Sequence, residues 1–396
     1  MIFSPFRLLC LTGFLAIFGT TMAKNPVLPF FAESLGADAR AIGLVASLSP
    51  LAGVLVSLPA GMLSDRIGRG RLLRLSGLFF ALSPLGYLWA GSVWELAMVR
   101  FIHGLATGIF MPVAMALVAD MHAASRGERL GLMSSVTQLG RFLAPLAGGA
   151  LLGLGGSIPG QEGFIWVYAG CLVLGTGAAL LVFRLPMDTP KMKAAGAGPP
   201  AALLGAVLRN RPVLLGCLVE AGALFAFGTF EAFFPRHVRD AGFGPHWAGL
   251  LMAAQVLTVA LSKPVFGRLS DRKGREWQIV FGAVAMSATM FAMGQAGSLV
   301  SLGAISLALG LSLSFTLAAS SAFIADASSA ETRGTAMGLL GSIMDIGHST
   351  GPLAAGMIIA VYGNVGGFLC SGLVVLAAGI VFAIHGARAA KADRHS

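Results

Sequence analysis

Between Phe6 and His385 the sequence contains twelve stretches of about 20 mostly apolar residues, separated by short segments in which charged residues cluster. An α-helix of this length crosses the roughly 30 Å hydrocarbon core of a bilayer. With 11% charged residues, the chain is too apolar for a soluble protein of 396 residues. The stretches lack the alternating polarity of transmembrane barrel strands. The predicted fold is therefore an all-α membrane protein with twelve transmembrane helices.

The positive charge of the chain has an uneven distribution along the sequence. The net charge of +10 would be compatible with nucleic acid, but 21 of the 27 basic residues fall in the even-numbered loops and the terminal segments. The opposite loops hold only Arg40, Arg236 and Arg239. This asymmetry predicts an orientation with both termini in the cytoplasm, in a plasma membrane of the bacterial inner-membrane type, and no nucleic-acid partner. Residues 8–19 also fit the hydrophobic core of a secretion signal, which is the alternative interpretation.

The chain contains an internal repeat. The string "GMLSDRIGRGR" at Gly61–Arg71 returns as "GRLSDRKGRE" at Gly267–Glu276, 206 residues later. At an offset of 207, Arg126–Gly149 aligns without gaps on Arg333–Gly356, with ten identities in 24 positions. A repeat of six spans begins and ends on one side of the membrane, so the two copies have parallel topology. The predicted organisation is a six-helix bundle at residues 1–184, a cytoplasmic linker at 185–211, a second bundle at 212–386 and a cytoplasmic tail at 387–396.

The repeated string carries a resemblance to a known family. It has the form G-x-L-x-D-R-x-G-R, which resembles the signature that the major facilitator superfamily has between its second and third helices. "LAMVRFIHG" resembles the family's R-x-x-Q-G pattern at Arg100 and Gly104, with His103 in place of glutamine. The residues that match the loop signature and its second copy are Gly61, Asp65, Arg66, Gly68, Arg69, Asp271 and Arg272. The resemblance covers essentially the whole chain and implies transport by alternating access.

A second motif resembles one found in the exporters of this family. "GRFLAPLAGG" is similar to the antiporter motif G-x-x-x-G-P-x-x-G-G, and "GHSTGPLAAG" repeats it in the eleventh span. The matching residues are Gly140, Pro145 and Gly149 in the first copy and Gly347, Gly351 and Pro352 in the second. The resemblance implies proton-driven export of drugs or metabolites.

Both motifs also have a physical interpretation that does not depend on the family. Glycines allow the tight turn of the loop, and an acid at the membrane surface can pair with arginine in one conformational state only. Small residues four apart allow close helix contact, and proline bends the helix. The alternatives are loop arginines that only anchor the chain at lipid headgroups, and glycines that only pack.

Ionisable residues within apolar spans are costly, by about 2.5–3.5 kcal/mol each on insertion scales, and each needs a partner, water or a function. The candidates are Lys24, Arg100, His103, Arg141, Glu220, Glu231, Asp345 and His348. Glu220 and Glu231 are eleven residues apart and fall within about 20° of one helical face, with Phe227 and Phe234 beside it. This acidic and aromatic face is suited to a lipophilic cation.

Roles follow for the individual charges. Near the middle of the bilayer, loss of solvent favours the neutral form of Glu220, as a proton carrier requires, although a permanent pair with a base such as Arg100 is the alternative.

Glu231 and Lys24 are the predicted outer gate. Arg100 and His103 lie one turn apart and share a direction, with His103 either a proton relay or a packing residue. Asp345 and His348 are expected to form an internal hydrogen-bonded pair. Arg141 is a candidate cation for substrate or for Glu220, and the alternative is that these groups only satisfy one another.

The resulting functional hypothesis is a proton-coupled antiporter that exports a small amphipathic molecule, with small-molecule substrate and protons as its partners. We expect a monomer without cofactor. An enzyme is not expected, because the sequence shows no metal-ligand spacing, phosphate loop or nucleophile elbow. The first alternative is a uniporter or proton symporter for an anionic metabolite, with Lys24, Arg100 and Arg141 as binding cations. The second is a transport-dead relative that acts as a membrane receptor.

Overall fold

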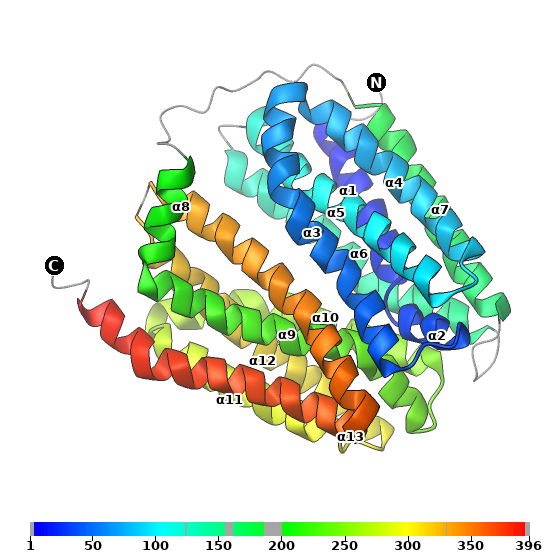
Figure 1. Cartoon of the computed structure of the whole chain (residues 1–396). Coiled ribbons are helices and arrows are strands. Elements are labelled where there is room, and N and C mark those ends of the chain that lie inside the picture. Colours follow the sequence, from blue (N-terminus) through cyan, green and yellow to red (C-terminus); the bar gives the residue numbers. More distant parts are fainter. Residues whose placement is uncertain (1–3, 123–124, 155–160, 186–199, 330, 393–396) are drawn as a thin grey trace. The chain divides into compact units, whose positions relative to one another are not determined.

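The computed structural model describes residues 4–122, 125–154, 161–185, 200–329 and 331–392, and in these ranges the chain is helical with no strand (Figure 1). The prediction of an all-α fold is confirmed. The first seven helices are α1 (Pro5–Met22), α2 (Val27–Ser34), α3 (Ala39–Ile67), α4 (Arg69–Trp89), α5 (Val93–Met121), α6 (Arg126–Gly153) and α7 (Gln161–Phe183). The remaining six are α8 (Pro200–Arg209), α9 (Arg211–Asp240), α10 (Pro245–Lys273), α11 (Glu276–Met293), α12 (Leu299–Asp326) and α13 (Arg333–Ala392).

Several helices begin at side chains that accept hydrogen bonds from the first turn. Asp38 accepts from the Ala41 amide at the start of α3, and Ser92 accepts from Glu95 at the start of α5. Ser298 and Ser301 form a capping box at the start of α12. These side chains satisfy amides that have no partner within the helix, so they define where the helices start.

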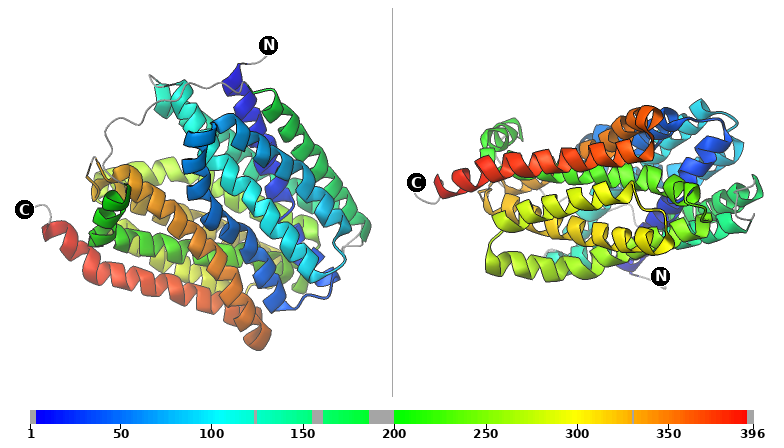
Figure 2. Two further views of the ribbon diagram at one scale, coloured as in Figure 1. Left: turned by 45° about the horizontal axis from the view of Figure 1, so that its top comes forward. Right: turned by 90° about the horizontal axis from the view of Figure 1, so that it is seen from below.

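Ten of the described helices are long and apolar enough to cross a membrane. Helix α6 has 28 residues but is not among the ten. Helix α13 is counted once although its backbone leaves helical geometry at Gly363, where φ is +70°, and Figures 1 and 2 show the chain changing direction sharply there, between its orange and red parts. Twelve crossings require α6 to span and α13 to cross twice, and that count stays a prediction.

The exposed surface of the described helices is rich in large apolar side chains. Val300 is 83% exposed, Trp89 80%, Val173 73% and Leu58 69%. Exposing such a side chain to water costs about 1.5–3 kcal/mol relative to burying it. Exposing it to the hydrocarbon of a membrane carries no such cost. Together with the ten candidate spans, this surface shows an integral membrane protein.

The helices form two compact units, one of residues 1–193 with 234–253 and the other of residues 194–233 with 254–396. In the first unit α3 packs on α5, α4 on α5 and α7, and α1 on α6 and α7. In the second unit α11 packs on α12 and α13. Helices α9 and α10 are divided, so that the end of α9 and the beginning of α10 belong to the first unit. Within the predicted linker, residues 186–199 lie outside the described ranges and 200–209 form α8.

Candidate functional site

The two copies of the loop signature adopt matching geometry in the two units. Gly68 joins α3 to α4 with φ of +99°, and Gly274 joins α10 to α11 with φ of +92°. A residue with a side chain rarely adopts this conformation, which accounts for glycine at both positions. Arg69 Nε lies 2.8 Å from Asp120 Oδ2 in the first unit. At the repeat-related positions, Arg275 Nη2 lies 2.9 Å from Asp326 Oδ2.

The other residues of the loop signature are placed less tightly. Arg66 and Arg272 are exposed, and a Cβ built on Gly61 would meet no atom within 4 Å. Asp271 is 63% exposed and also accepts from Arg275, at 3.3 Å. The side chain of Asp65 lies outside the described part of the structure, so its role as a state-dependent partner stays a prediction. Asp120 and Asp326 are not among the predicted site residues, although they lie 206 residues apart, at the offset of the repeat.

We expect the two Arg–Asp pairs to differ in strength because their burial differs. The Arg69 and Asp120 side chains are 15% and 13% exposed, whereas Arg275 and Asp326 are 21% and 64% exposed. Asp120→Asn should lower the free energy of unfolding by about 1–2 kcal/mol, because the arginine keeps its charge in a place where water screens it poorly. Asp326→Asn should cost about 0–1 kcal/mol, as for an exposed pair. Thermal unfolding of the two purified variants measures the difference, and equal losses would contradict it.

The glycines of the antiporter-like motif lie where helix backbones touch. A Cβ added to Gly140 on α6 would meet the Phe14 carbonyl oxygen of α1 at 3.0 Å, and one added to Gly347 on α13 would meet the Ala221 Cα at 3.0 Å. Gly351 is similarly close to the Phe225 backbone. Pro145 and Pro352 stand inside α6 and α13, and both are buried. Any larger residue at these glycines would push the helices apart.

Gly149 makes a further contact within the first unit. A Cβ built on Gly149 would lie 2.9 Å from the Pro245 carbonyl oxygen and 3.0 Å from the Gly249 Cα. Gly249 in turn lies against the Pro145 carbonyl. The antiporter-like motif of α6 therefore packs directly on the beginning of α10, with glycine facing glycine.

A buried polar chain in the first unit contains two of the predicted site residues. Arg100 Nη1 donates to the Tyr87 hydroxyl at 3.3 Å, and that hydroxyl lies 3.2 Å from His103 Nδ1. His103 Nε2 lies 3.0 Å from Thr20 Oγ1 on α1. Arg100 and His103 are 1% and 2% exposed and both contact the same hydroxyl, while their roles in transport stay predictions. Sequence reasoning did not include Tyr87, which bridges the two.

Arg100 is incompletely paired within this chain of contacts. Its Nε has no hydrogen-bond partner among the described residues, and neither does the hydroxyl of Tyr168, whose ring stacks on Tyr87 with centroids 4.6 Å apart. A buried guanidinium with an unused donor is costly, and an anion placed against it would remove that cost.

Glu220 is completely buried on α9 and is held by two hydroxyl groups of α12. Ser320 Oγ donates to Glu220 Oε1 at 2.6 Å, and Ser321 Oγ donates to the same oxygen at 2.7 Å. Glu220 Oε2 has no hydrogen-bond partner within the described ranges. The carboxyl group is therefore solvated by neutral donors on one oxygen, while the other oxygen is available for a proton.

Glu231 makes a short contact with a histidine of α13. Glu231 Oε2 lies 2.6 Å from His348 Nε2 on α13, and the edge of His348 meets Phe227 with centroids 5.7 Å apart. The predicted gate between Glu231 and Lys24 and the predicted pair of Asp345 with His348 stay predictions. Lys24 lies half-buried between α1 and α2, and Asp345 lies half-buried one turn before His348. Phe234 is completely buried, as Glu220 is, and its place on a substrate-binding face stays a prediction.

The remaining charged residues of interest are Arg141 and a cluster of ion pairs at the end of α9. Arg141 is exposed on α6 and has no ion-pair partner in the described ranges. Glu33 of α2 is bound by both Arg236 and Arg239, with its Oε1 3.3 Å from Arg236 Nε. Arg239 also donates to Asp240 at 3.0 Å. In the sequence these arginines stand out only as members of the sparsely charged loops, and the repeat gives no signal for the cluster.

Sequence comparison places the chain among transporters. The Major Facilitator Superfamily matches it over residues 9–248 and 216–395. The multidrug resistance protein MdtG of Klebsiella pneumoniae (strain 342) is 28% identical over 389 residues, covering 94% of this chain and 92% of that protein. An uncharacterized MFS-type transporter, MJ1560 of Methanocaldococcus jannaschii, is 24% identical over 363 residues, covering 90% and 92% of the two chains.

Solved structures show the same fold at lower identity. A bacterial homolog of the human lysosomal transporter Spinster, in an inward-facing and unoccupied conformation, has a TM-score of 0.78 at 18% identity, covering 97% of this chain and 95% of that one. The nucleoside transporter NupG has a TM-score of 0.79 at 16% identity, covering 98% and 100%. Both similarities concern the fold alone.

Proposed function

Because this chain belongs to the Major Facilitator Superfamily and is a transporter rather than an enzyme, we propose that it exports a small amphipathic cation in exchange for protons. The similarity to the multidrug resistance protein MdtG supports the direction and the substrate class. The proposal retains the predicted orientation, with both termini in the cytoplasm of a bacterial cell.

The environment of Glu220 is the observation that carries the proposal. A proton carrier must be tolerated both as a carboxylate and as a neutral acid inside the membrane. Two serine hydroxyls donate to Oε1 in either form, and Oε2 has no competing described partner when a proton arrives. An ion pair with arginine or lysine would hold Glu220 in its charged form. Within the described ranges Glu220 forms no such pair. The alternative of a permanent ion pair finds no support there.

The substrate class follows from competition for the same carboxylate. A charged Glu220 attracts a cationic group, and a protonated Glu220 releases it, so that proton and substrate exchange. Phe227 is half-buried on α9 between the levels of Glu220 and Glu231, and its π-system suits a lipophilic cation. Since Glu231 is hydrogen-bonded to His348, we assign to that pair a secondary role, in which it retains a proton or an amine near the far end of α9.

The conformational switch in this proposal uses both repeated motifs. The Arg69–Asp120 and Arg275–Asp326 pairs stabilise one state of each unit, and the Gly149–Gly249 contact is the surface on which α6 and α10 separate and return. An interface of glycine against glycine has little side-chain interlocking, so the free energy of separating it is small.

Transport of ethidium, an aromatic cation, tests the proposal. Everted membrane vesicles that contain the protein should accumulate ethidium when an acid-inside gradient is imposed, and an uncoupler should release it. Vesicles without the protein are the control. Accumulation that is unaffected by the uncoupler would contradict proton exchange, and no accumulation would contradict this substrate class.

Arg100 favours a second candidate function, transport of an anionic metabolite. Its buried guanidinium donates to Tyr87 and has an unused Nε among the described contacts, which a carboxylate would satisfy. A thermal-shift comparison of the purified protein separates the two functions. Stabilisation by ethidium and not by benzoate supports the exporter, and the reverse supports the anion transporter. A transport-dead receptor would bind one of them without moving it across the vesicle membrane.

A further inference from the structure

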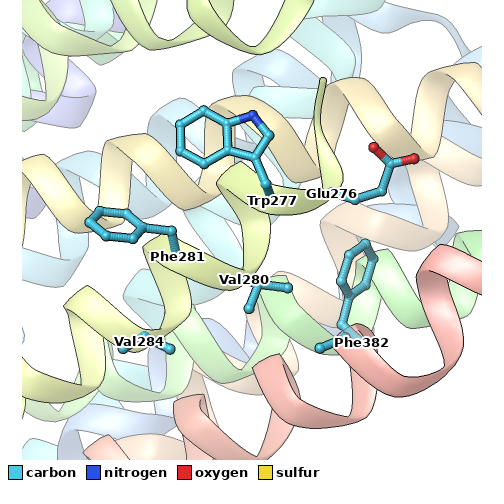
Figure 3. A pocket seen from close by; sticks show the side chains of 7 residues that line it. Glu276, Trp277, Val280, Phe281, Val284 and Phe382 are labelled. Atoms are coloured by element: carbon cyan, nitrogen blue, oxygen red, sulfur yellow. The ribbon is translucent and has the colours of Figure 1, made fainter. Parts of the chain in front are cut away.

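A groove lies between the beginning of α11 and the end of α13, and its lining includes none of the residues to which transport is assigned above. It has a volume of about 540 Å³ and is lined by Glu276, Trp277, Val280, Phe281, Val284, Phe382 and Ala383, of which Glu276 directly follows Arg275 of the switch pair. Figure 3 shows Trp277 and Phe281 projecting from α11, with Phe382 reaching from the red helix toward Glu276, whose carboxylate lies near one end. All seven residues belong to the second unit.

The walls of the groove are suited to a hydrocarbon chain. Trp277, Phe281 and Val284 recur at helical spacing and are 42%, 59% and 47% exposed, so this stripe of α11 faces the surroundings of the protein. Phe382 is completely buried and forms the floor. A groove lined in this way offers a water molecule too few hydrogen-bond partners. Within a membrane-spanning helix pair, an acyl chain is the occupant that satisfies it.

The chemistry at one end of the groove distinguishes among lipids. Glu276 is the first residue of α11, directly after the turn at Gly274, and is half-buried with no ion pair in the part of the chain that the structure describes. Trp277 beside it has an indole N–H, and such side chains favour the level of the lipid headgroups. An acyl chain in the groove thus brings its headgroup to a carboxylate, which attracts an ammonium group and repels an anionic headgroup.

Basic residues at the same turn supply the complementary contact. Arg272 and Lys273 are exposed in the last turn of α10, on the other side of Gly274. A headgroup that carries both a phosphate and a primary ammonium is matched by this combination of charges. A quaternary ammonium keeps the charge but cannot donate hydrogen bonds to the carboxylate, so it gains less.

We propose that this groove binds one acyl chain of a phospholipid with a primary-ammonium headgroup, whose ammonium group contacts Glu276. The groove is then a specific lipid site on the lipid-facing surface of the second unit. The proposal does not depend on which molecule the protein transports.

Fluorescence of Trp277 tests the proposal directly. The variant with Trp89, Trp94, Trp166 and Trp247 replaced by phenylalanine retains Trp277 as the single tryptophan. In liposomes, phosphatidylethanolamine with brominated acyl chains should bind in the groove about threefold more tightly than brominated phosphatidylcholine, as judged by quenching of Trp277 fluorescence. Threefold is the factor expected for a partly exposed charge contact. Glu276→Gln should bring this ratio to about one while quenching itself persists. Val284→Phe, which fills the groove, should weaken quenching by both lipids.

Three results would overturn the proposal. Equal quenching by the two lipids in the protein with Glu276 intact would mean a nonspecific lipid annulus. A preference for phosphatidylethanolamine that survives Glu276→Gln would place the ammonium group elsewhere. Quenching that ethidium abolishes would make the groove a substrate site. Thermal unfolding of each variant, compared with the parent, shows that the protein remains folded in every arm of the test.

Discussion

Replacing Glu220 with glutamine is expected to abolish ethidium accumulation driven by a proton gradient, to less than about a tenth of the parent rate, while the protein stays folded. A tenfold loss corresponds to about 1.4 kcal/mol, and losing the group that carries the exchanged proton should exceed it. Glutamine keeps the shape and can still accept from Ser320 and Ser321 through its side-chain oxygen. Fluorescence of everted vesicles that contain the variant measures the rate.

Two control variants make this prediction specific to Glu220. Glu95→Gln removes an exposed carboxylate at the beginning of α5 and should leave transport unchanged. Glu231→Gln removes the partner of His348 and should lower the rate without abolishing its dependence on the gradient. If Glu220→Gln kept full gradient-driven transport while Glu231→Gln lost it, the proton would belong to the Glu231–His348 pair.

Replacing Gly249 with alanine is expected to destabilise the contact between α6 and α10 and to impair transport. The added Cβ would approach the Pro145 carbonyl and the Gly149 Cα, which are backbone atoms that cannot move aside alone. Overpacking of this kind costs about 1–3 kcal/mol. The gain in helix propensity from glycine to alanine, about 0.5–1 kcal/mol, offsets only part of this cost. The free energy of unfolding in detergent and the ethidium rate report the two effects.

A matched glycine substitution on α6, away from the contact with α10, should have the opposite sign. Gly131 is exposed, and a Cβ added there would meet nothing within 4 Å. Gly131→Ala should therefore be neutral or slightly stabilising, by up to about 1 kcal/mol, because only the propensity term remains. If Gly249→Ala and Gly131→Ala changed stability equally, the glycine contact would have no special role in the switch.

The fold and the two switch motifs were largely predictable because they depend on features local in the sequence or repeated in it. The turn glycines Gly68 and Gly274 show the positive φ that a short connection requires. The repeat offset that aligns Arg69 with Arg275 also aligns Asp120 with Asp326, and both pairs form. Helical period alone indicated that Arg100 and His103 share a face.

The pairing of buried charges was not predictable, because it depends on how each helix is rotated against its neighbours. Glu231 contacts His348 because α13 passes close to α9 at Gly228, where the space for a Cβ is taken by the His348 backbone. Ser320 and Ser321 lie a hundred residues from Glu220 and carry no charge that would attract notice in the sequence. The Glu33 cluster likewise has no counterpart in the repeat.

The central claim is that a proton and a cationic substrate compete for the carboxyl group of Glu220. Proton release from the purified protein in weakly buffered detergent, followed with a pH indicator during addition of ethidium, tests this claim most directly. The expected result is about one proton released for each ethidium bound by the parent protein, and no release by the Glu220→Gln variant. Ethidium binding to the parent without proton release, or undiminished release by the variant, would contradict the claim.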